Sequence, residues 1–171
     1  MSEYAFVTFW HVRAPIEVVW EEVFHSERWP RWWKGLEDVV EVRRGDHHSV
    51  GSIRRFTWKG RLPYTLVVDM EVTRVEPPVT LESAASGELE GRGLWRLSHD
   101  DDGTTVRYEW NVRTTKRWMN VLAPLARSLF KWNHDLVMRQ GGEGLKRLLE
   151  TSASSTTLAD ADGARTGSRR M

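Results

Sequence analysis

The chain has 171 residues, with 25 basic and 24 acidic side chains and no cysteine. This length fits one domain with a buried core, and the balanced charge argues against a nucleic-acid-binding domain, which needs a basic face. The lack of cysteine excludes disulfides, thiolate zinc sites and cysteine nucleophiles. No apolar run approaches the ~20 residues of a membrane span, and residues 1–6 lack the layout of a signal peptide. We therefore expect a cytoplasmic protein that binds no nucleic acid.

Tryptophan is the unusual feature of the composition, because 10 of the 18 aromatic residues carry an indole ring. Each buried ring removes ~150–250 Å² from water, and a buried indole N–H needs a hydrogen-bond acceptor. So many indoles in a small domain predict either a bulky core or an aromatic-lined pocket.

The N-terminal part of the chain predicts one strand and two helices. Residues 4–13 alternate in the way of a strand whose inner face carries Trp10. Apolar residues at helical spacing predict a helix over 16–24, with Pro15 at its start. We expect Ser26 to cap a second short helix, which contains Trp29, Trp32 and Trp33, and Gly35 to end it.

From residue 36 the hydrophobic period falls to two, which is typical of strands. Six further strands are predicted, over residues 37–44, 51–59, 64–75, 79–86, 92–99 and 104–114. Turn signals separate them, including Pro77-Pro78 and the glycines of 87–91. Short connections imply an antiparallel meander, so the whole sheet is expected to have seven strands.

A long amphipathic helix is predicted over residues 124–149. On its inner face, large apolar groups alternate with Ala126, Asn133, Gln140 and Gly144. Two interpretations remain open: these small and polar residues form a cavity wall, or they allow close helix–sheet packing.

The last 21 residues hold one leucine and little else to bury. Residues 151–171 are therefore predicted to form a disordered polar tail, after a single domain of residues 1–150.

Standard catalytic motifs are absent: the sequence has no phosphate-binding loop, no HExxH and no GxSxG. His47 and His48 lie in a polar turn, where we expect exposed histidines and no metal. His134 and Asp135 point ~100° apart on the helix, so they do not form an acid–base pair. We interpret His134 as either a structural or a cavity residue, and we predict no cofactor.

The indoles and their neighbours give the candidate site. Core packing is one explanation, and the sharper one is a pocket lined by aromatic side chains with a few polar groups. The candidate ligand-binding residues that line this cavity are Trp10, Arg55, Trp58, Trp95, Tyr108, Trp110, Asn133, Val137 and Gln140.

A family resemblance rests on short segments in a fixed order. These are HVRAPIEVVWEEV (11–23), WPxWW (29–33), VGSIRR (50–55), VEPP (75–78), GxGxWxL (91–97), GTTVRYEW (103–110), TTKRWMNVLAPLAR (114–127) and WNHDLVMRQGGEGL (132–145). Over residues 4–149 the chain resembles the START-like SRPBCC family, in particular its polyketide cyclase/dehydrase branch. The resemblance implies an α+β helix-grip fold, in which a curved seven-stranded antiparallel sheet surrounds the long C-terminal helix. Two short helices lie between strands 1 and 2.

The resemblance also implies an internal cavity for an apolar small molecule. Our leading hypothesis is a carrier of a hydrophobic, ring-containing metabolite or lipid. The alternative is a cofactor-free polyketide cyclase or dehydratase, a lyase or isomerase, whose catalytic candidates are Arg55, Tyr108, Asn133 and His134. A third hypothesis is a partner-binding domain with an exposed patch at Trp29, Trp32 and Trp33. The sequence does not define the oligomeric state.

Overall fold

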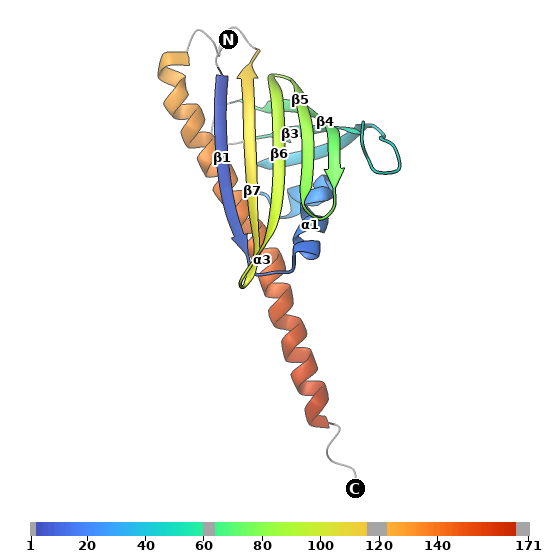
Figure 1. Cartoon of the computed structure of the whole chain (residues 1–171). Coiled ribbons are helices and arrows are strands. Elements are labelled where there is room, and N and C mark those ends of the chain that lie inside the picture. Colours follow the sequence, from blue (N-terminus) through green and yellow to red (C-terminus); the bar gives the residue numbers. More distant parts are fainter. Residues whose placement is uncertain (1–2, 60–63, 116–122, 167–171) are drawn as a thin grey trace.

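A computed structural model describes the backbone of residues 3–59, 64–115 and 123–166, but not the side chains of 123–127, 129 and 152–166. The chain folds into a sheet, a pair of short N-terminal helices and a long C-terminal helix (Figure 1). The elements in order are β1 (Glu3–Val12), α1 (Ile16–Phe24), the 3-10 helix η1 (Ser26–Arg31), β2 (Leu36–Arg43), β3 (Ile53–Trp58), β4 (Leu66–Glu76), β5 (Thr80–Gly87), β6 (Leu89–Asp100), β7 (Gly103–Thr114) and α3 (Ala123–Thr166).

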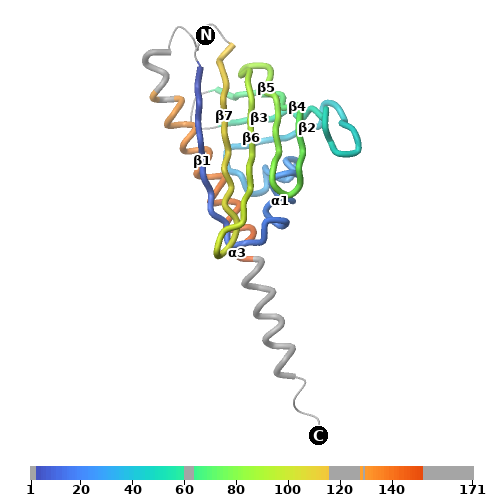
Figure 2. Tube along the Cα trace, in the orientation of Figure 1, coloured from blue at the N-terminus to red at the C-terminus, as the bar shows by residue number. Residues whose placement is uncertain are grey.

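The seven strands form one antiparallel sheet in the order β1-β7-β6-β5-β4-β3-β2. Strands β2 to β7 pair with their neighbours in the chain, as short connections require. The pair α1 and η1 separates β1 from β2, so that β1 closes the other edge against β7. Strands β2 and β3 run across the direction of β1 and β7 (Figure 2), and the curved sheet wraps around one side of α3.

The predicted α+β helix-grip architecture is confirmed, including the seven strands and the two short helices. Helix α1 has the predicted bounds. The prediction fails at Gly91, which was expected in a turn and lies within β6. A Cβ on Gly91 would overlap the backbone oxygen of Asn111. The close approach of β7 therefore explains this glycine.

Ser26 does not cap the second helix, because it is the first residue of η1 and makes no side-chain cap hydrogen bond. Its hydroxyl instead accepts a hydrogen bond from the Arg54 guanidinium at 3.0 Å. Gly35 ends the segment as predicted, with a φ of +94° that favours glycine.

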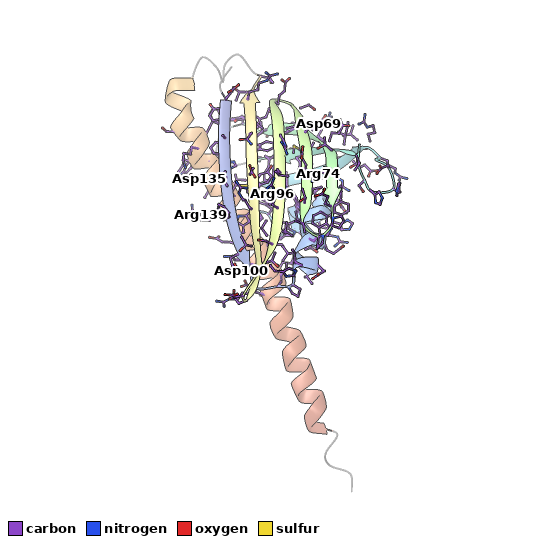
Figure 3. The ribbon with its side chains drawn as sticks, viewed as in Figure 1. Asp69, Arg74, Arg96, Asp100, Asp135 and Arg139 are labelled. Atoms are coloured by element: carbon purple, nitrogen blue, oxygen red, sulfur yellow. The ribbon has the colours of Figure 1, made fainter. Side chains whose placement is uncertain are left out.

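Helix α3 is longer than predicted, because its helical backbone continues beyond residue 149 to Thr166. No proline or glycine stands between residues 150 and 163 to stop it. The domain boundary at residue 150 and the disorder of 151–171 stay predictions. The exposed Asp135 and Arg139 lie on its solvent side (Figure 3), as the amphipathic pattern indicates.

Tryptophan side chains dominate the core between the sheet, η1 and α3. Trp29, Trp32 and Trp33 are 6%, 7% and 2% exposed. The hypothesis of an exposed tryptophan patch for a partner is therefore wrong. Trp29 in η1 and the two tryptophans directly after it pack against one another, with ring centroids 5.1 to 6.1 Å apart.

Candidate functional site

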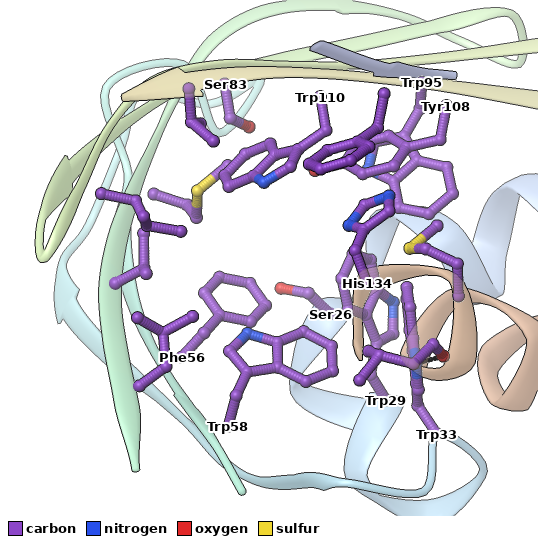
Figure 4. Close-up of a pocket in the computed structure, with 18 of the residues that line it drawn as sticks. Ser26, Trp29, Trp33, Phe56, Trp58, Ser83, Trp95, Tyr108, Trp110 and His134 are labelled. Atoms are coloured by element: carbon purple, nitrogen blue, oxygen red, sulfur yellow. Dashed lines mark hydrogen bonds between the residues drawn. The ribbon is translucent and has the colours of Figure 1, made fainter. Parts of the chain in front are cut away.

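A cavity of about 190 Å³ lies between the concave face of the sheet and the first half of the described part of α3. Figure 4 shows aromatic rings reaching into it from the sheet, from η1 and from α3. Aliphatic side chains of β4, among them Val68 and Val72, cover the remaining wall. The interior of this fold is therefore hollow at one end and solid at the other.

Six of the nine predicted site residues lie on this cavity. They are Trp58, Trp95, Tyr108, Trp110, Asn133 and Val137. Strands β3, β6 and β7 present the four aromatic residues, and α3 presents the other two. The alternation of each strand and the helical period bring together residues up to 79 positions apart.

Three predicted residues lie elsewhere. Trp10 is buried behind the cavity, with its ring 5.2 Å from that of Trp33 and 5.4 Å from that of Trp95. Arg55 is exposed on the outer face of β3 and forms a bidentate ion pair with Asp69. The Gln140 Oε1 lies against the connection between η1 and β2, 3.9 Å from the place that a Cβ on Gly35 would take.

The glycines after Gln140 show why no cavity lies beside this part of α3. A Cβ on Gly141 would overlap the Trp33 ring, and a Cβ on Gly144 would overlap the backbone oxygen of Trp32. Gln140 and Gly144 are therefore closely packed and do not line the cavity, but here α3 packs against residues 32–35 and not against the sheet as the close-packing interpretation expected. The side chain of Ala126, which belonged to the same pattern, is outside the described part of the helix.

One wall of the cavity is a ladder of aromatic rings. Trp95 and Tyr108 are cross-strand partners in β6 and β7, and their rings stack with centroids 4.0 Å apart. The ring of Trp110 follows on the same face, 5.9 Å from Tyr108. Burial raises the pKa of the Tyr108 hydroxyl above its ordinary value, so this group stays protonated.

A second wall is fixed by one hydrogen bond and one edge-on ring contact. The Trp33 indole N–H donates to the backbone oxygen of Val137 at 2.8 Å, which ties η1 to α3. Trp58 meets the Trp33 ring edge-on, with centroids 5.2 Å apart. The two tryptophans are thus held in place before any ligand arrives.

Arg54 and Ser26 line the cavity and were missed by sequence reasoning. The Arg54 guanidinium donates to the hydroxyl of Ser26 and to the backbone oxygen of Phe24, and it lies 3.5 Å from a carboxylate oxygen of Glu27. Its side chain is 15% exposed, against 52% for that of Arg55. The adjacent arginines break the alternation of this strand, so that the sequence alone did not show which one points inward.

His134 reaches into the cavity from α3 (Figure 4), where its imidazole stacks on the ring of Phe6 with centroids 4.0 Å apart. Burial lowers its pKa from 6.5 to about 4, since the nearby Asp135 only partly offsets the loss of water. The imidazole is therefore neutral at pH 7. Of the two sequence interpretations of His134, the geometry supports the cavity residue.

Tyr64 is the other titratable cavity residue with a resolved shift. Burial and the nearby Glu88 raise its pKa to about 12.

Within the described residues, no three histidine or acidic side chains are grouped to hold a metal ion. None of the described helices has the length and apolar character needed to cross a membrane.

The profile of the family described as polyketide cyclase / dehydrase and lipid transport matches residues 5–150. The chain belongs to this family. The match extends over the sheet, both short helices and the part of α3 that forms the cavity. It confirms the resemblance to the polyketide cyclase/dehydrase branch. No curated protein sequence matches the chain.

Several solved structures share the fold of this family member. The di-domain ARO/CYC protein BexL from the BE-7585A biosynthetic pathway superposes with a TM-score of 0.69 at 16% identity, over 86% of this chain and 50% of its own. The di-domain ARO/CYC protein StfQ from the steffimycin biosynthetic pathway gives 0.69 at 13%, over 89% and 52%. The protein TTHA0849 from Thermus thermophilus gives 0.63 at 17%, over 84% and 97%. The chain thus spans about half the length of the two di-domain proteins.

Proposed function

We propose that the chain binds a hydrophobic, ring-containing small molecule or lipid in the cavity between the sheet and α3, and that it carries or sequesters this ligand. The observation that supports this most is a cavity of about 190 Å³ with aromatic rings on several walls. An apolar cavity of ~150 Å³ stays dry and binds benzene. The available volume is therefore enough for a compact ring compound.

The affinity expected from such a site is moderate. Burying ~300 Å² of apolar ligand surface contributes roughly 7 kcal/mol before the costs of ordering. This sets the upper limit of the affinity at a dissociation constant in the micromolar range. The prearranged Trp33 and Trp58 lower the ordering cost, because their rings are already packed against each other and Trp33 is hydrogen-bonded to α3.

A cavity-filling substitution tests this proposal. Ser83 lines the cavity from β5, whereas Ser86 on the same strand is exposed. We expect Ser83→Phe to weaken the binding of naphthalene, measured by equilibrium dialysis, by at least about tenfold, because the added ring occupies the ligand's space. Ser86→Phe is the matched control and should bind like the unmodified protein. Absence of naphthalene binding to the unmodified protein, or unchanged binding to Ser83→Phe, would contradict the proposal.

The alternative is a cofactor-free cyclase or dehydratase that acts in the same cavity. It is supported by the family description and by the presence of Arg54, Tyr108 and His134 on one cavity. Such chemistry needs a positioned acid or base in a shielded site. Arg55, one of the four catalytic candidates, faces away from the cavity and is not proposed again.

The protonation states favour binding over turnover. A base with a pKa of about 4, such as His134, is a weak proton acceptor at pH 7. Burial raises the pKa of the Tyr108 hydroxyl, which therefore keeps its proton. Ring closure of a linear poly-β-keto thioester, followed by liquid chromatography and mass spectrometry, separates the two functions. A carrier leaves the rate at its value in buffer, whereas an enzyme raises it and loses the gain in His134→Phe.

A further inference from the structure

Seven buried side-chain polar atoms of the described residues have no hydrogen-bond partner, and three of them belong to residues that line the cavity. These three atoms are the Tyr4 hydroxyl, the Asn133 Oδ1 and the His134 Nε2. A buried polar group without a partner is costly, and in native proteins it calls for an explanation such as a ligand or a catalytic role. Three such atoms on one cavity indicate that the site is incomplete without a polar group from outside the chain.

The three residues belong to the same region of the cavity, where β1 faces α3. Asn133 and His134 are consecutive in α3, and the ring of Phe6 in β1 stacks on the imidazole. The ring of Tyr4, two residues before Phe6 on the same face of β1, is 6.0 Å from the Phe6 ring and 5.8 Å from that of Phe130. Phe130 lies one helical turn before His134 and closes this group.

The described lining of the cavity offers no free charge for an anionic ligand. His134 is neutral at pH 7, for the reason given above. The Arg54 guanidinium is already engaged by Ser26, the backbone of Phe24 and the carboxylate of Glu27. A buried carboxylate would find no unpaired cation here, and burial of an unpaired charge is strongly unfavourable.

We propose that Asn133 and His134, with Tyr4 beside them, form a hydrogen-bonding subsite for the hydroxyl group of an uncharged ring compound, such as a phenol. The amide oxygen of Asn133 only accepts, so the ligand must bring an O–H or N–H donor, and a hydroxyl is the group that can also accept through the same atom. The same ligand oxygen can then accept a hydrogen bond from the hydroxyl of Tyr4 or from the N–H of the neutral His134 ring. Ethers, hydrocarbons and carboxylates lack the donor. This inference rests on the proposed function and narrows its ligand class.

Three matched probes test the ligand class with the full-length protein at pH 7. They are naphthalene, 2-naphthol and 2-naphthoate, which share a ring system and differ in one group. By equilibrium dialysis we expect 2-naphthol to bind about fivefold to tenfold more tightly than naphthalene, the effect of one or two recovered hydrogen bonds. We expect 2-naphthoate to bind more weakly than naphthalene.

Substitutions in α3 locate the effect. Asn133→Leu and His134→Phe remove the polar atoms and keep a branched or ring-shaped side chain, and Phe can keep the stacking on Phe6. Each should reduce the preference for 2-naphthol over naphthalene to less than about twofold. Gln140→Leu is the matched control, since it deletes the same amide from the same helix outside the cavity. It should keep the full preference.

The outcomes separate this inference from the proposed function. If none of the probes binds, the proposed function fails. If naphthalene binds but 2-naphthol has no advantage, or if the advantage survives in both Asn133→Leu and His134→Phe, the hydroxyl subsite is wrong and the carrier proposal stands. Tighter binding of 2-naphthoate would overturn the assignment to uncharged ligands and would favour a site at Arg54. The probe comparison on the unmodified protein decides even if a variant does not fold.

Discussion

Glycine and tryptophan residues are paired across the interface between α3 and the rest of the core. Gly141 faces the ring of Trp33, Gly142 faces the ring of Trp10, and Gly144 faces the backbone of Trp32. A side chain at any of these glycines would push the helix away from an indole or from the backbone. The GGxG segment is therefore a requirement of packing, although glycine lowers helix propensity by about 1 kcal/mol relative to alanine.

We expect Gly144→Ala to destabilise the protein by about 2 kcal/mol, despite the gain in helix propensity. The new methyl group would overlap a backbone oxygen, which has less freedom to move than the end of a side chain. Urea unfolding followed by circular dichroism measures the loss. Glu143→Ala, at the exposed neighbouring position, is the control and should stay close to the unmodified protein. Equal or higher stability of Gly144→Ala would show that the backbone of Trp32 does not pack closely against Gly144.

His134 makes stability depend on pH in a defined direction. The folded state holds its pKa at about 4, below the unperturbed 6.5. Between pH 6.5 and pH 4 the imidazole therefore binds a proton in the unfolded chain but not in the folded protein. The free energy of unfolding falls as the pH falls through this range. Between pH 7 and pH 5 this costs about 2 kcal/mol. The variant His134→Phe should lose correspondingly less stability over this range in urea titrations at both pH values. An identical pH dependence of the two proteins would contradict the burial of this imidazole.

At the level of elements, the register of β3 decides which arginine meets the cavity. Arg54 turns inward and connects β3 to α1 and η1 through the oxygens of Phe24 and Ser26. Arg55 turns outward and connects β3 to Asp69 on β4. The two neighbours thus have different structural roles.

Alanine substitutions separate these roles. We expect Arg54→Ala to cost about 2 kcal/mol, because the partly buried acceptors of the guanidinium lose their donor. Arg55→Ala should change stability far less, since it removes an exposed ion pair. Thermal unfolding of both variants under one condition provides the comparison. A larger loss for Arg55→Ala would reverse the assigned faces of β3.

The element pattern was predictable because the hydrophobic period is regular over long segments. The period of two placed Trp95, Tyr108 and Trp110 on the inner face, and the helical period placed Asn133 and Val137 on the inner side of α3. The period fails where polar residues are adjacent, as at Arg54. Periodicity also shows which face of an element points inward but not which part of its length borders the cavity. It therefore predicts Gln140 and Trp10 on the cavity, although both lie beside the solid end of the core.

At the level of the molecule, the sheet and α3 enclose a cavity on the side of Asn133 and a packed core on the side of Gly144. Cavity volume depends on how tightly distant elements approach one another. That distance is set here by Trp10, Trp32 and Trp33 and their glycine partners in α3, a tertiary relation that periodicity does not contain. From the sequence alone, both a cavity wall and close packing are possible for the inner face of α3. The half that carries Asn133 borders the cavity, and the half that carries Gly144 is closely packed.

The proposed domain of residues 1–150 predicts that the polar tail contributes little to folding. Residues 152–171 hold one leucine and no aromatic residue, so they bury little apolar surface. Deletion of 152–171 should change the free energy of unfolding by less than about 0.5 kcal/mol. It should also leave naphthalene binding unchanged. A loss of several kcal/mol in urea unfolding would extend the domain beyond its predicted boundary.

We expect the space between the curved sheet and α3 to hold a small-molecule ligand. Native mass spectrometry of the protein, purified rapidly and without organic solvent, tests it most directly. We predict an additional species heavier than the polypeptide by the mass of one small molecule, which disappears in Ser83→Phe and persists in Ser86→Phe. A bare polypeptide mass in all three proteins, together with no uptake of added naphthalene by the unmodified protein, would contradict the claim.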